Sequence, residues 1–404
     1  MRKIGLLLFV VYSSLLRLAA TPVGHEAADS IVADTLRISI VTCDPGPDVY
    51  QIFGHTAIRV QRSGVDAVDL AFNYGIFSFQ TGNFIYKFVK GETDYRLGVY
   101  DFTYFMPDYV MRGSTVVEQE LNLTQQEKQQ LFDRLLVNAM PENRVYRYNF
   151  LFDNCATRPR VLTKASLGDC GEHIVFAEPY SSVSFRDIIR HYGKNYSWLL
   201  FGIDLALGHD LDRAATWEEQ MFIPIIFRDA CRDARIVDAE GAERPLVKQE
   251  TYLYESDTVA VLPPTPWYMT PMACTLLLLL VGAAITWCDM RKKSVSRWFD
   301  TVLNLLFFVM GSIIYFLVFC SEHPATTINI NALWLTPLAI LPVFVPYMRC
   351  HGVMRVYHIG NLVLLALFAI LALCRVQVIN VAFIPLVLLS ALRSFNYLIF
   401  LKAK

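Results

Sequence analysis

Two patterns of hydrophobic residues follow one another along this chain of 404 residues. From about residue 28 to residue 263, apolar and polar positions are mixed, as in a domain that folds in water. After residue 267, long apolar runs approach the roughly 20 residues that an α-helix needs to cross a bilayer. The proline-rich stretch VLPPTPWYMTP, residues 261–271, separates the two parts. We therefore predict a first domain over residues 21–263 and a transmembrane domain over residues 264–404.

Within the first domain, the pattern predicts strands first and helices later. Segments rich in β-branched and aromatic residues, bounded by turn residues, favour strands over residues 36–43, 55–61, 67–75, 94–102 and 114–123. Residues 124–140 favour a helix, because Thr124 and Glu127 form a capping box ahead of an apolar face. Further helices are predicted over residues 154–167, 185–191 and 198–207. This order of elements is typical of the α+β class.

The apolar runs of the second part predict five membrane spans, over residues 268–287, 298–320, 332–348, 356–374 and 378–401. The loops RKKSVSR and MRCHGVMR and the lysines of the tail are basic, which places them in the cytoplasm. The alternate loops, SEHPATTININ and RVQVIN, then lie on the opposite side together with the first domain.

The amino terminus agrees with this topology. A basic start, an apolar run and small residues at Ala19 and Ala20 predict a signal peptide over residues 1–20. The first cysteine is Cys43, so no lipoprotein anchor is expected at the cleavage site. The balance of 36 Lys and Arg against 37 Asp and Glu argues against nucleic acid as a partner. The sequence therefore predicts an exported domain held at a lipid bilayer.

One cysteine stands at the start of a predicted helix, in the stretch FLFDNCATRPR. Backbone N–H groups at a helix start, and the nearby Arg158, would lower the pKa of Cys155 and favour the nucleophilic thiolate. A disulfide is the alternative, because the exported domain also contains Cys43, Cys170 and Cys231 in an oxidising compartment. Four cysteines allow three full pairings, and their spacing does not choose between them.

A nucleophilic thiol needs a base, and His55 in FGHTAIRV is the best candidate. It begins a predicted strand after Gly54, a residue that permits close approach of another chain or a substrate. Asn73, on the next strand, would accept a hydrogen bond from the far ring nitrogen. The predicted roles are Cys155 as nucleophile, His55 as base and then acid, and Asn73 as orienter. Otherwise His55 is a buried structural histidine and Asn73 a turn residue.

The motifs together resemble a known family. The stretches TCDPGPDVYQIFGHTAIRV, FNYGIFSFQTGNFIYKFVKG, FLFDNCATRPR and SEHPATTININALWLTPL are similar to those of the Bacteroidota lipoprotein N-acyltransferase family, over nearly the whole mature chain. The order of histidine before cysteine is similar to the circularly permuted NlpC/P60-like group. The resemblance implies a permuted papain-like domain with His55 and Cys155 as catalytic residues.

The same resemblance implies the reaction and its partners. An acyl chain would move from a membrane phospholipid, through a thioester on Cys155, to the α-amine of a diacylglyceryl-cysteine lipoprotein. The protein would lie in the bacterial inner membrane with its catalytic domain in the periplasm. We expect no cofactor, and no metal, because no His, Cys and carboxylate residues have ligand spacing.

Two other functions fit the same residues. A membrane-anchored cell-wall amidase or endopeptidase of NlpC/P60 type would use the same pair of residues, whereas a non-enzymatic scaffold would hold Cys155 in a disulfide. Two segments have open roles. Glu322 and His323 are either solvated or contact a lipid head group or amine. The aromatic residues of 76–91 either admit acyl chains at the interface or pack in the core.

Overall fold

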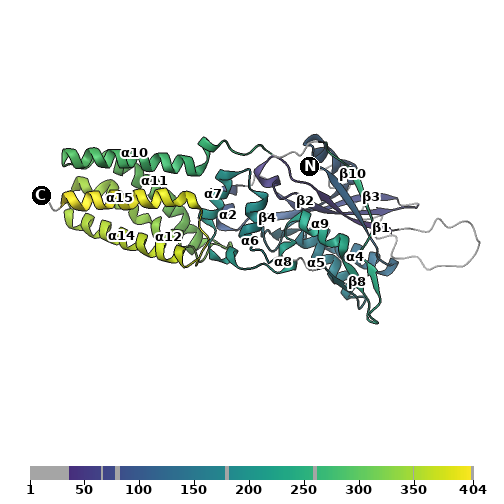
Figure 1. Cartoon of the computed structure of the whole chain (residues 1–404). Coiled ribbons are helices and arrows are strands. Elements are labelled where there is room, and N and C mark those ends of the chain that lie inside the picture. The colour runs from purple at the N-terminus through teal and green to yellow at the C-terminus, as the bar shows by residue number, and fades with distance from the viewer. Residues whose placement is uncertain are drawn as a thin grey trace, which may run out of the picture.

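The computed structural model describes residues 36–64, 67–77, 82–177, 182–257, 262–348 and 350–401, and the predicted signal peptide over residues 1–20 lies outside them. The molecule is elongated, with a mixed α/β domain at one end and a helical bundle at the other (Figure 1). The N-terminal domain continues into the bundle through a linker that ends at Trp267 to Met269.

A seven-stranded antiparallel sheet forms the centre of the N-terminal domain. Its strands lie in the order β10-β5-β1-β2-β3-β4-β6. Their bounds are β1 Leu36–Cys43, β2 His55–Arg62, β3 Val68–Ile76, β4 Asp94–Asp101, β5 Val116–Leu121, β6 Val145–Arg147 and β10 Val247–Tyr254. A separate three-stranded sheet contains β7 His173–Val175, β8 Arg235–Val237 and β9 Glu243–Pro245.

Both faces of the large sheet are covered, because successive side chains of each strand point to opposite faces. On one face, Ile40, Ile58 and Phe72 pack in the core with helices α4 (Gln125–Ala139), α5 (Thr157–Gly168) and α9 (Pro224–Asp233). On the other face, Ala57 and Ala71 pack against the aromatic residues of η2 (Phe102–Tyr104) and α3 (Met106–Met111). The middle strands β1 and β2 are therefore held rigidly from two sides.

The remaining helices lie between the sheet and the bundle or along the edge of the sheet. They are η1 Val49–Gln51, α2 Phe84–Lys90, α6 Phe185–Tyr192, α7 Ser197–Ala206, η3 His209–Asp212 and α8 Trp217–Gln220. Figure 1 shows α2 and α7 at the junction with the bundle.

The five predicted strands and the capped helix are present close to their expected positions. Thr124 accepts a hydrogen bond from the Glu127 N–H, and the Glu127 carboxylate accepts one from the Thr124 N–H. The helix expected over residues 154–167 begins later, at Thr157, and ends at Gly168. The edge strand β10 and the helix α2 were not predicted.

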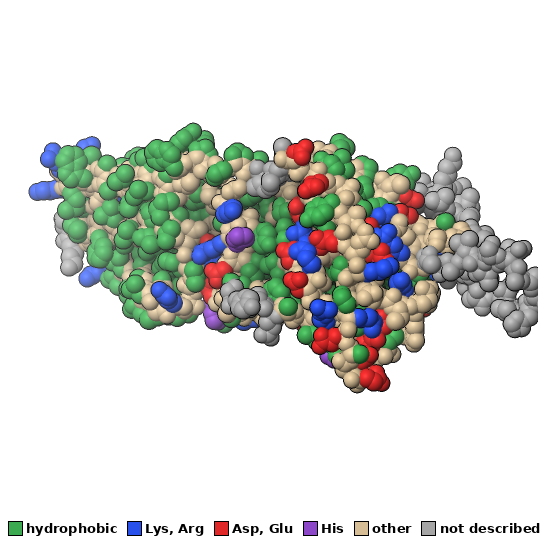
Figure 2. All heavy atoms as spheres, turned by 45° about the vertical axis from the view of Figure 1, so that its right-hand side comes forward, with side chains coloured by type: hydrophobic (Ala, Val, Ile, Leu, Met, Phe, Trp, Pro, Cys, Tyr) green, Lys and Arg blue, Asp and Glu red, His purple; other side chains and the backbone are tan. Residues whose placement is uncertain are grey.

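Among the described residues, four helices are long and apolar enough to cross a membrane. They are α10 Pro271–Lys292, α11 Arg297–Cys320, α14 His351–Leu373, and α15 Ile384–Leu401 with the preceding turn η7 Val381–Phe383. Figure 2 shows hydrophobic side chains covering the bundle, charged side chains on the sheet domain, and basic side chains at the far end of the bundle. Arg291 and Lys292, in the last turn of α10, belong to a loop predicted to be cytoplasmic.

The third predicted span, over residues 332–348, is not one continuous helix. This segment is broken into α12 Asn331–Trp334, η5 Pro337–Ile340, α13 Leu341–Phe344 and η6 Val345–Met348. Its prolines explain the breaks, because each lacks an N–H donor and disfavours helical backbone in the residue before it. The segment still runs the length of the bundle, since Asn331 contacts the N-terminal domain and Pro346 lines a hollow with Arg297.

Buried charges inside the bundle are paired with one another. Arg393, in the middle of α15, is 3% exposed. Its guanidinium contacts Asp289 Oδ2 at 2.9 Å and Asp300 Oδ1 at 2.6 Å, so it joins α15 to α10 and α11. Pairing of this kind offsets much of the cost of an ionised group at membrane depth.

A second buried network joins the two parts of the molecule. Arg186 of α6 is 1% exposed and pairs with Asp204 at 2.8 Å and Asp212 at 2.5 Å. Asn380, which precedes η7, donates to the Asp204 carboxylate at 3.0 Å, and the Val378 N–H donates to Asp212 at 3.0 Å. The sheet domain is therefore fixed on the end of the bundle rather than tethered by the linker alone.

Candidate active site

His55 lies at the end of the sheet, where strand β2 begins. In the antiparallel register it stands opposite Cys43, the last residue of β1. Its side chain is on the same face as Ala57, and its ring stacks over Tyr109 with centroids 6.3 Å apart. The packed aromatic residues of α3 and η2 therefore hold the imidazole from one side.

Asn73 orients this imidazole. Its side-chain oxygen lies 2.6 Å from His55 Nε2, and its amide nitrogen donates to the Tyr100 hydroxyl at 2.6 Å. Because an amide oxygen only accepts hydrogen bonds, Nε2 is the nitrogen that carries the proton in a neutral ring. The other nitrogen, Nδ1, is then available to accept a proton from a thiol.

Cys155 approaches from the opposite face of the sheet, just before helix α5. Asn154 holds this turn in place: its side-chain oxygen accepts from the N–H groups of Ala156 at 2.8 Å and Thr157 at 3.0 Å. Its side-chain nitrogen donates to the carbonyls of Phe150 and Phe222, each at 2.9 Å. Asn154 is 4% exposed, so the turn that presents the thiol is anchored inside the domain.

Gly75 lets the two side chains meet. Its φ is +92°, and β3 has an irregularity between Asn73 and Ile76. A Cβ atom on Gly75 would lie 3.6 Å from Cys155 Cβ and 4.0 Å from His55 Cε1. A larger side chain there would occupy space beside both reactive groups, and positive φ would strain it.

The start of strand β2 carries a further backbone donor. β3 pairs with β2 only from Ile58 onward, so the N–H of Thr56 is not used by β3. It donates instead to the Cys155 sulfur, which also accepts hydrogen bonds from its own N–H and from His55.

The electrostatics of the pair favour a thiolate and an imidazolium. Burial raises the pKa of the Cys155 thiol, but the adjacent His55 charge and the hydrogen bonds to the sulfur outweigh it, so the pKa is lowered. Burial lowers the pKa of His55, but the Cys155 thiolate and the hydrogen bonds to Cys155 and Asn73 outweigh it, so the pKa is raised. This is the arrangement that activates a cysteine nucleophile.

Comparison with known protein families places this geometry in context. Residues 25–174 match the model of the Lnb N-terminal periplasmic domain, and residues 264–404 match that of the Lnb transmembrane domain. The chain belongs to the Lnb family. It is therefore a membrane protein with a periplasmic portion, and His55, Asn73 and Cys155 all lie inside the periplasmic match of this Lnb-family chain. No curated protein and no solved structure matches it significantly.

We predicted that Arg158 lowers the pKa of Cys155, but in this Lnb-family chain Arg158 binds other groups. Its guanidinium binds the Asp153 carboxylate through two hydrogen bonds of 2.6 and 2.8 Å and stacks over Tyr146, 3.5 Å from the ring centroid. A carboxylate in contact neutralises the guanidinium, so the cation beside the thiolate is His55. Arg160 donates to the carbonyl of Glu218, away from the thiol.

All nine cysteines of this Lnb-family chain are free. Cys43 and Cys231 are fully buried, and burial raises the pKa of each thiol. The pKa of Cys170 is also raised. The alternative disulfides of Cys155 with Cys170 or Cys231 are not formed, and Cys155 differs from these three thiols in the direction of its pKa shift.

Sequence reasoning missed three groups at this site: Gly75, the Tyr100 hydroxyl and the Thr56 N–H. The glycine was visible beside Asn73 in FNYG, but only the irregular pairing of β3 gives it a role. Tyr100 was visible in DYRLGVYDF, yet its contact depends on the pairing of β3 with β4.

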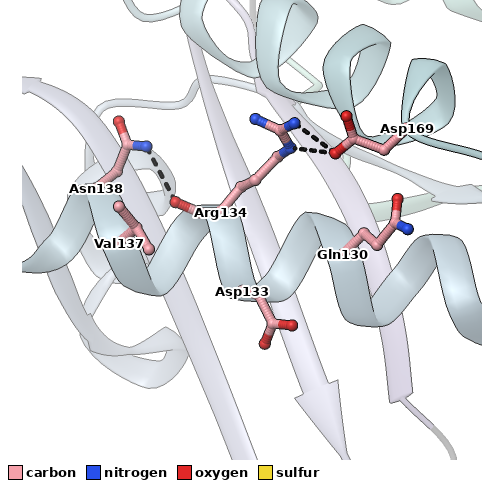
Figure 3. Close-up of a pocket in the computed structure, with 6 residues that line it drawn as sticks. All are labelled: Gln130, Asp133, Arg134, Val137, Asn138 and Asp169. Atoms are coloured by element: carbon pink, nitrogen blue, oxygen red, sulfur yellow. Dashed lines mark hydrogen bonds and ion pairs between the residues drawn. The ribbon is translucent and has the colours of Figure 1, made fainter.

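A hollow of about 380 Å³ lies elsewhere, along α4 (Figure 3). It is lined by Gln130, Asp133, Arg134, Val137, Asn138 and Asp169. Arg134 pairs with Asp169, which follows the end of α5, whereas Cys155 precedes its start. The hollow is therefore separate from the thiol, and its lining includes no histidine or cysteine. Within the described ranges, no group of three or more His, Cys, Asp or Glu residues is placed to hold a metal ion.

Proposed function

We propose that this protein is a lipoprotein N-acyltransferase that uses Cys155 as its nucleophile. The observation that carries the proposal is the paired thiol and imidazole at the end of the sheet nearest the membrane helices. The catalytic residues we assign are Cys155, His55 and Asn73. Both proposed substrates, a membrane phospholipid and a bacterial lipoprotein, are held in the bilayer, which accounts for a catalytic domain fixed on a helical bundle.

The position of the site supports this assignment. Strand β3 passes Gly75 and leads to α2, where Tyr86 contacts Phe316 of the membrane helix α11. At the same end of the sheet, Arg147 of β6 pairs with Glu322, which follows α11, at 3.0 Å. The sheet end that holds the thiol therefore faces the bundle.

In the first step, the Cys155 thiolate attacks an ester carbonyl of the phospholipid and a carbon–sulfur bond forms. The carbon–oxygen bond of the ester breaks, and the protonated His55 gives its proton to the departing lysophospholipid oxygen. The product is a thioester on Cys155. In this proposal the Cys155 N–H turns from the sulfur to the negative charge that develops on the carbonyl oxygen.

In the second step, the α-amine of the diacylglyceryl-cysteine attacks the thioester. His55 accepts the amine proton, an amide bond forms, and the Cys155 thiolate leaves. A thioester suits an amine acceptor because it divides one difficult acyl transfer into two easier steps. Neither step calls for a cofactor.

The arrangement also supports a permuted papain-like fold as part of the proposal. The cysteine stands before a helix on one face of the sheet, the histidine begins a strand, and an asparagine holds the far ring nitrogen. In the chain, the histidine and asparagine precede the cysteine, which is the order of the permuted NlpC/P60-like group.

The test is mass spectrometry of lipoprotein amino-terminal peptides from cells that lack this protein. Wild type is expected to restore the amide-linked acyl chain, whereas Cys155→Ser and His55→Ala are not. Cys170→Ser is the matched control, because this thiol lies beyond the other end of α5, and it should restore acylation. Acylation that persists without the protein, together with altered cell-wall fragments, would instead favour the amidase.

A further inference from the structure

Helix α2 is held by the membrane part of the chain through its last carbonyl groups. The final carbonyls of a helix have no partner within the helix and must find one elsewhere. Here the Phe88 carbonyl lies 2.7 Å from His323 Nε2, and the Lys90 carbonyl accepts from the Glu322 N–H at 2.8 Å. The carbonyl of Val89, between them, accepts from the Ser321 hydroxyl at 3.0 Å.

The backbone after α2 comes just as close. Gly91 has φ +82°, and a Cβ there would lie 3.0 Å from the His323 nitrogen and 3.2 Å from the Glu322 carbonyl carbon. Only glycine fits without a shift of one backbone. Gly91 caps α2 with its own N–H, and the loop between α11 and α12 binds the last carbonyl groups beside that cap. This contact assigns Glu322 and His323 a docking role.

Side chains continue this attachment. Val89 packs against the buried hydrophobic cluster of the bundle, and the Tyr86 ring lies 6.0 Å from that of Phe316 on α11. Helix α2 thus lies on the end of a membrane helix, where the bilayer surface is expected.

Three large apolar side chains of α2 remain exposed. Ile85 is 77% exposed, Tyr86 54% and Phe88 51%, and on α11 the nearby turn exposes Phe319 to 74%. Apolar surface of this kind is unfavourable in water and favourable in the boundary layer between head groups and acyl chains. Because this face continues the lipid-facing surface of α11, lipid acyl chains are the occupant it fits.

A row of aromatic rings leads from this face towards the thiol. Phe88 and Phe84 are stacked with centroids 6.1 Å apart, and Phe84 and Phe77 with centroids 6.0 Å apart. Phe77 follows Gly75 by two residues, and a Cβ atom built on Gly75 would lie 3.6 Å from Cys155 Cβ and 4.0 Å from His55 Cε1. The rings therefore form an apolar path between the membrane and the reactive pair.

We propose that α2 lies in the outer leaflet of the membrane and that the row Phe77, Phe84 and Phe88 holds an acyl chain of the donor glycerolipid. The chain lies along the rings and its ester reaches Cys155. This inference rests on the proposed function, because it describes how the donor of that reaction is bound.

The first experiment separates donor binding from chemistry. Full-length protein in phosphatidylethanolamine vesicles is followed by intact mass spectrometry for acylation of Cys155, and in parallel with the water-soluble ester p-nitrophenyl acetate. In Ile85→Glu and Phe88→Glu, acylation from the phospholipid should fall at least tenfold. In Ile85→Glu, which lies outside the row of rings, reaction with the soluble ester should stay unchanged. Val137→Glu, at an exposed valine on α4 away from the bundle, should change neither rate.

The outcomes are distinct. A wild-type protein that is not acylated by phospholipid would contradict the proposed function itself. A wild type that is acylated, with Ile85→Glu and Phe88→Glu equally fast, would overturn only the path along α2. Loss of the soluble-ester reaction in Ile85→Glu would overturn it too, because the substitution would then act on the reactive pair.

A second measurement does not depend on activity. Ile85→Trp and Val137→Trp are placed in vesicles of phospholipid brominated along the acyl chains, and their fluorescence is compared with that of wild type. The added tryptophan at position 85 should be quenched and that at position 137 should not. Equal quenching at the two positions would overturn the placement of α2 in the leaflet.

Discussion

The reactive pair and the junction between the domains both bury charge, but they treat it differently. At the junction, Arg186 is 1% exposed and is surrounded by two carboxylates and the carbonyls of Leu207 and Gly208. At the pair, Cys155 is only half-buried, and Gly75 leaves space beside it. A saturated, closed charge network gives stability and a fixed geometry. A charge pair with an open side is arranged for chemistry.

The largest effect should come from removing the base. His55→Ala is expected to slow acylation of Cys155 by roughly 10⁴-fold or more, because the thiol loses both its proton acceptor and the adjacent cation. Thermal unfolding in detergent should change little, since the half-buried ring is not part of a closed network. Rates are measured by mass spectrometry of the acyl-enzyme. A stability loss as large as that of an Arg186 variant would erase the distinction between the two regions.

Replacing Arg186 should have the opposite effect, a large loss of stability with little loss of activity per folded molecule. Arg186→Met leaves Asp204 and Asp212 without their cation, and a buried pair broken in this way costs about 3–5 kcal/mol. The free energy of unfolding is measured by denaturant titration in micelles, with activity per folded molecule as the second readout. Arg147→Met is the control, because its pair with Glu322 is exposed and should contribute about 0–1 kcal/mol. Activity lost without a change in stability would contradict this prediction.

Asn73 should have an intermediate effect on rate. Asn73→Ala removes the acceptor on His55 Nε2, so the imidazole loses its orientation and acylation should slow by about 10²-fold. Tyr100→Phe leaves Asn73 in place and removes one hydrogen bond to it, so its effect should be smaller. A pH–rate profile of both variants shows whether the loss follows the imidazole. A Tyr100→Phe variant slower than Asn73→Ala would reverse the assigned order.

The smallest and most selective effect is a shift in the pH dependence of Cys155 alkylation. Cys155 alkylation by iodoacetamide should rise with pH through the lowered pKa of its thiol. In His55→Gln the cation is gone and burial dominates, so the midpoint should move to higher pH. Arg158→Gln should leave it unchanged, because Arg158 is bound to Asp153. Cys231, a buried thiol with a raised pKa, is the internal control within the same digest. A shift in Arg158→Gln would restore that arginine to the site.

Local pattern was enough to predict most of the sheet and the three central site residues. Strand alternation located β1 to β5, and the capping box located α4, because both signals lie within a few neighbouring residues. His55, Asn73 and Cys155 were predicted as site residues from their residue types and from the family resemblance. The structure brings them together at one end of the sheet.

What could not be predicted depends on contacts between distant segments. Arg158 was assigned to the thiolate by proximity in sequence, but Asp153 and Tyr146 hold it elsewhere. Gly75 acquires its role from an irregular pairing of β3 with β4. Strand β10 joins the sheet beside β5, where Val247 pairs with Leu121, a residue 126 positions earlier in the chain. The third span has the hydropathy of a helix, and its prolines divide it.

The junction around Arg186 also determines how this architecture can be recombined. In the sequence the chain divides near residue 264, where one family match begins. In space, Asn380 and Val378 of the last loop complete the charge network of α6 and η3. A chimera cut at the linker would keep Arg186 beside Asp204 and Asp212 but would remove the donors that Asn380 and Val378 supply. Relatives should therefore exchange the whole chain, or else the catalytic domain together with residues 377–380.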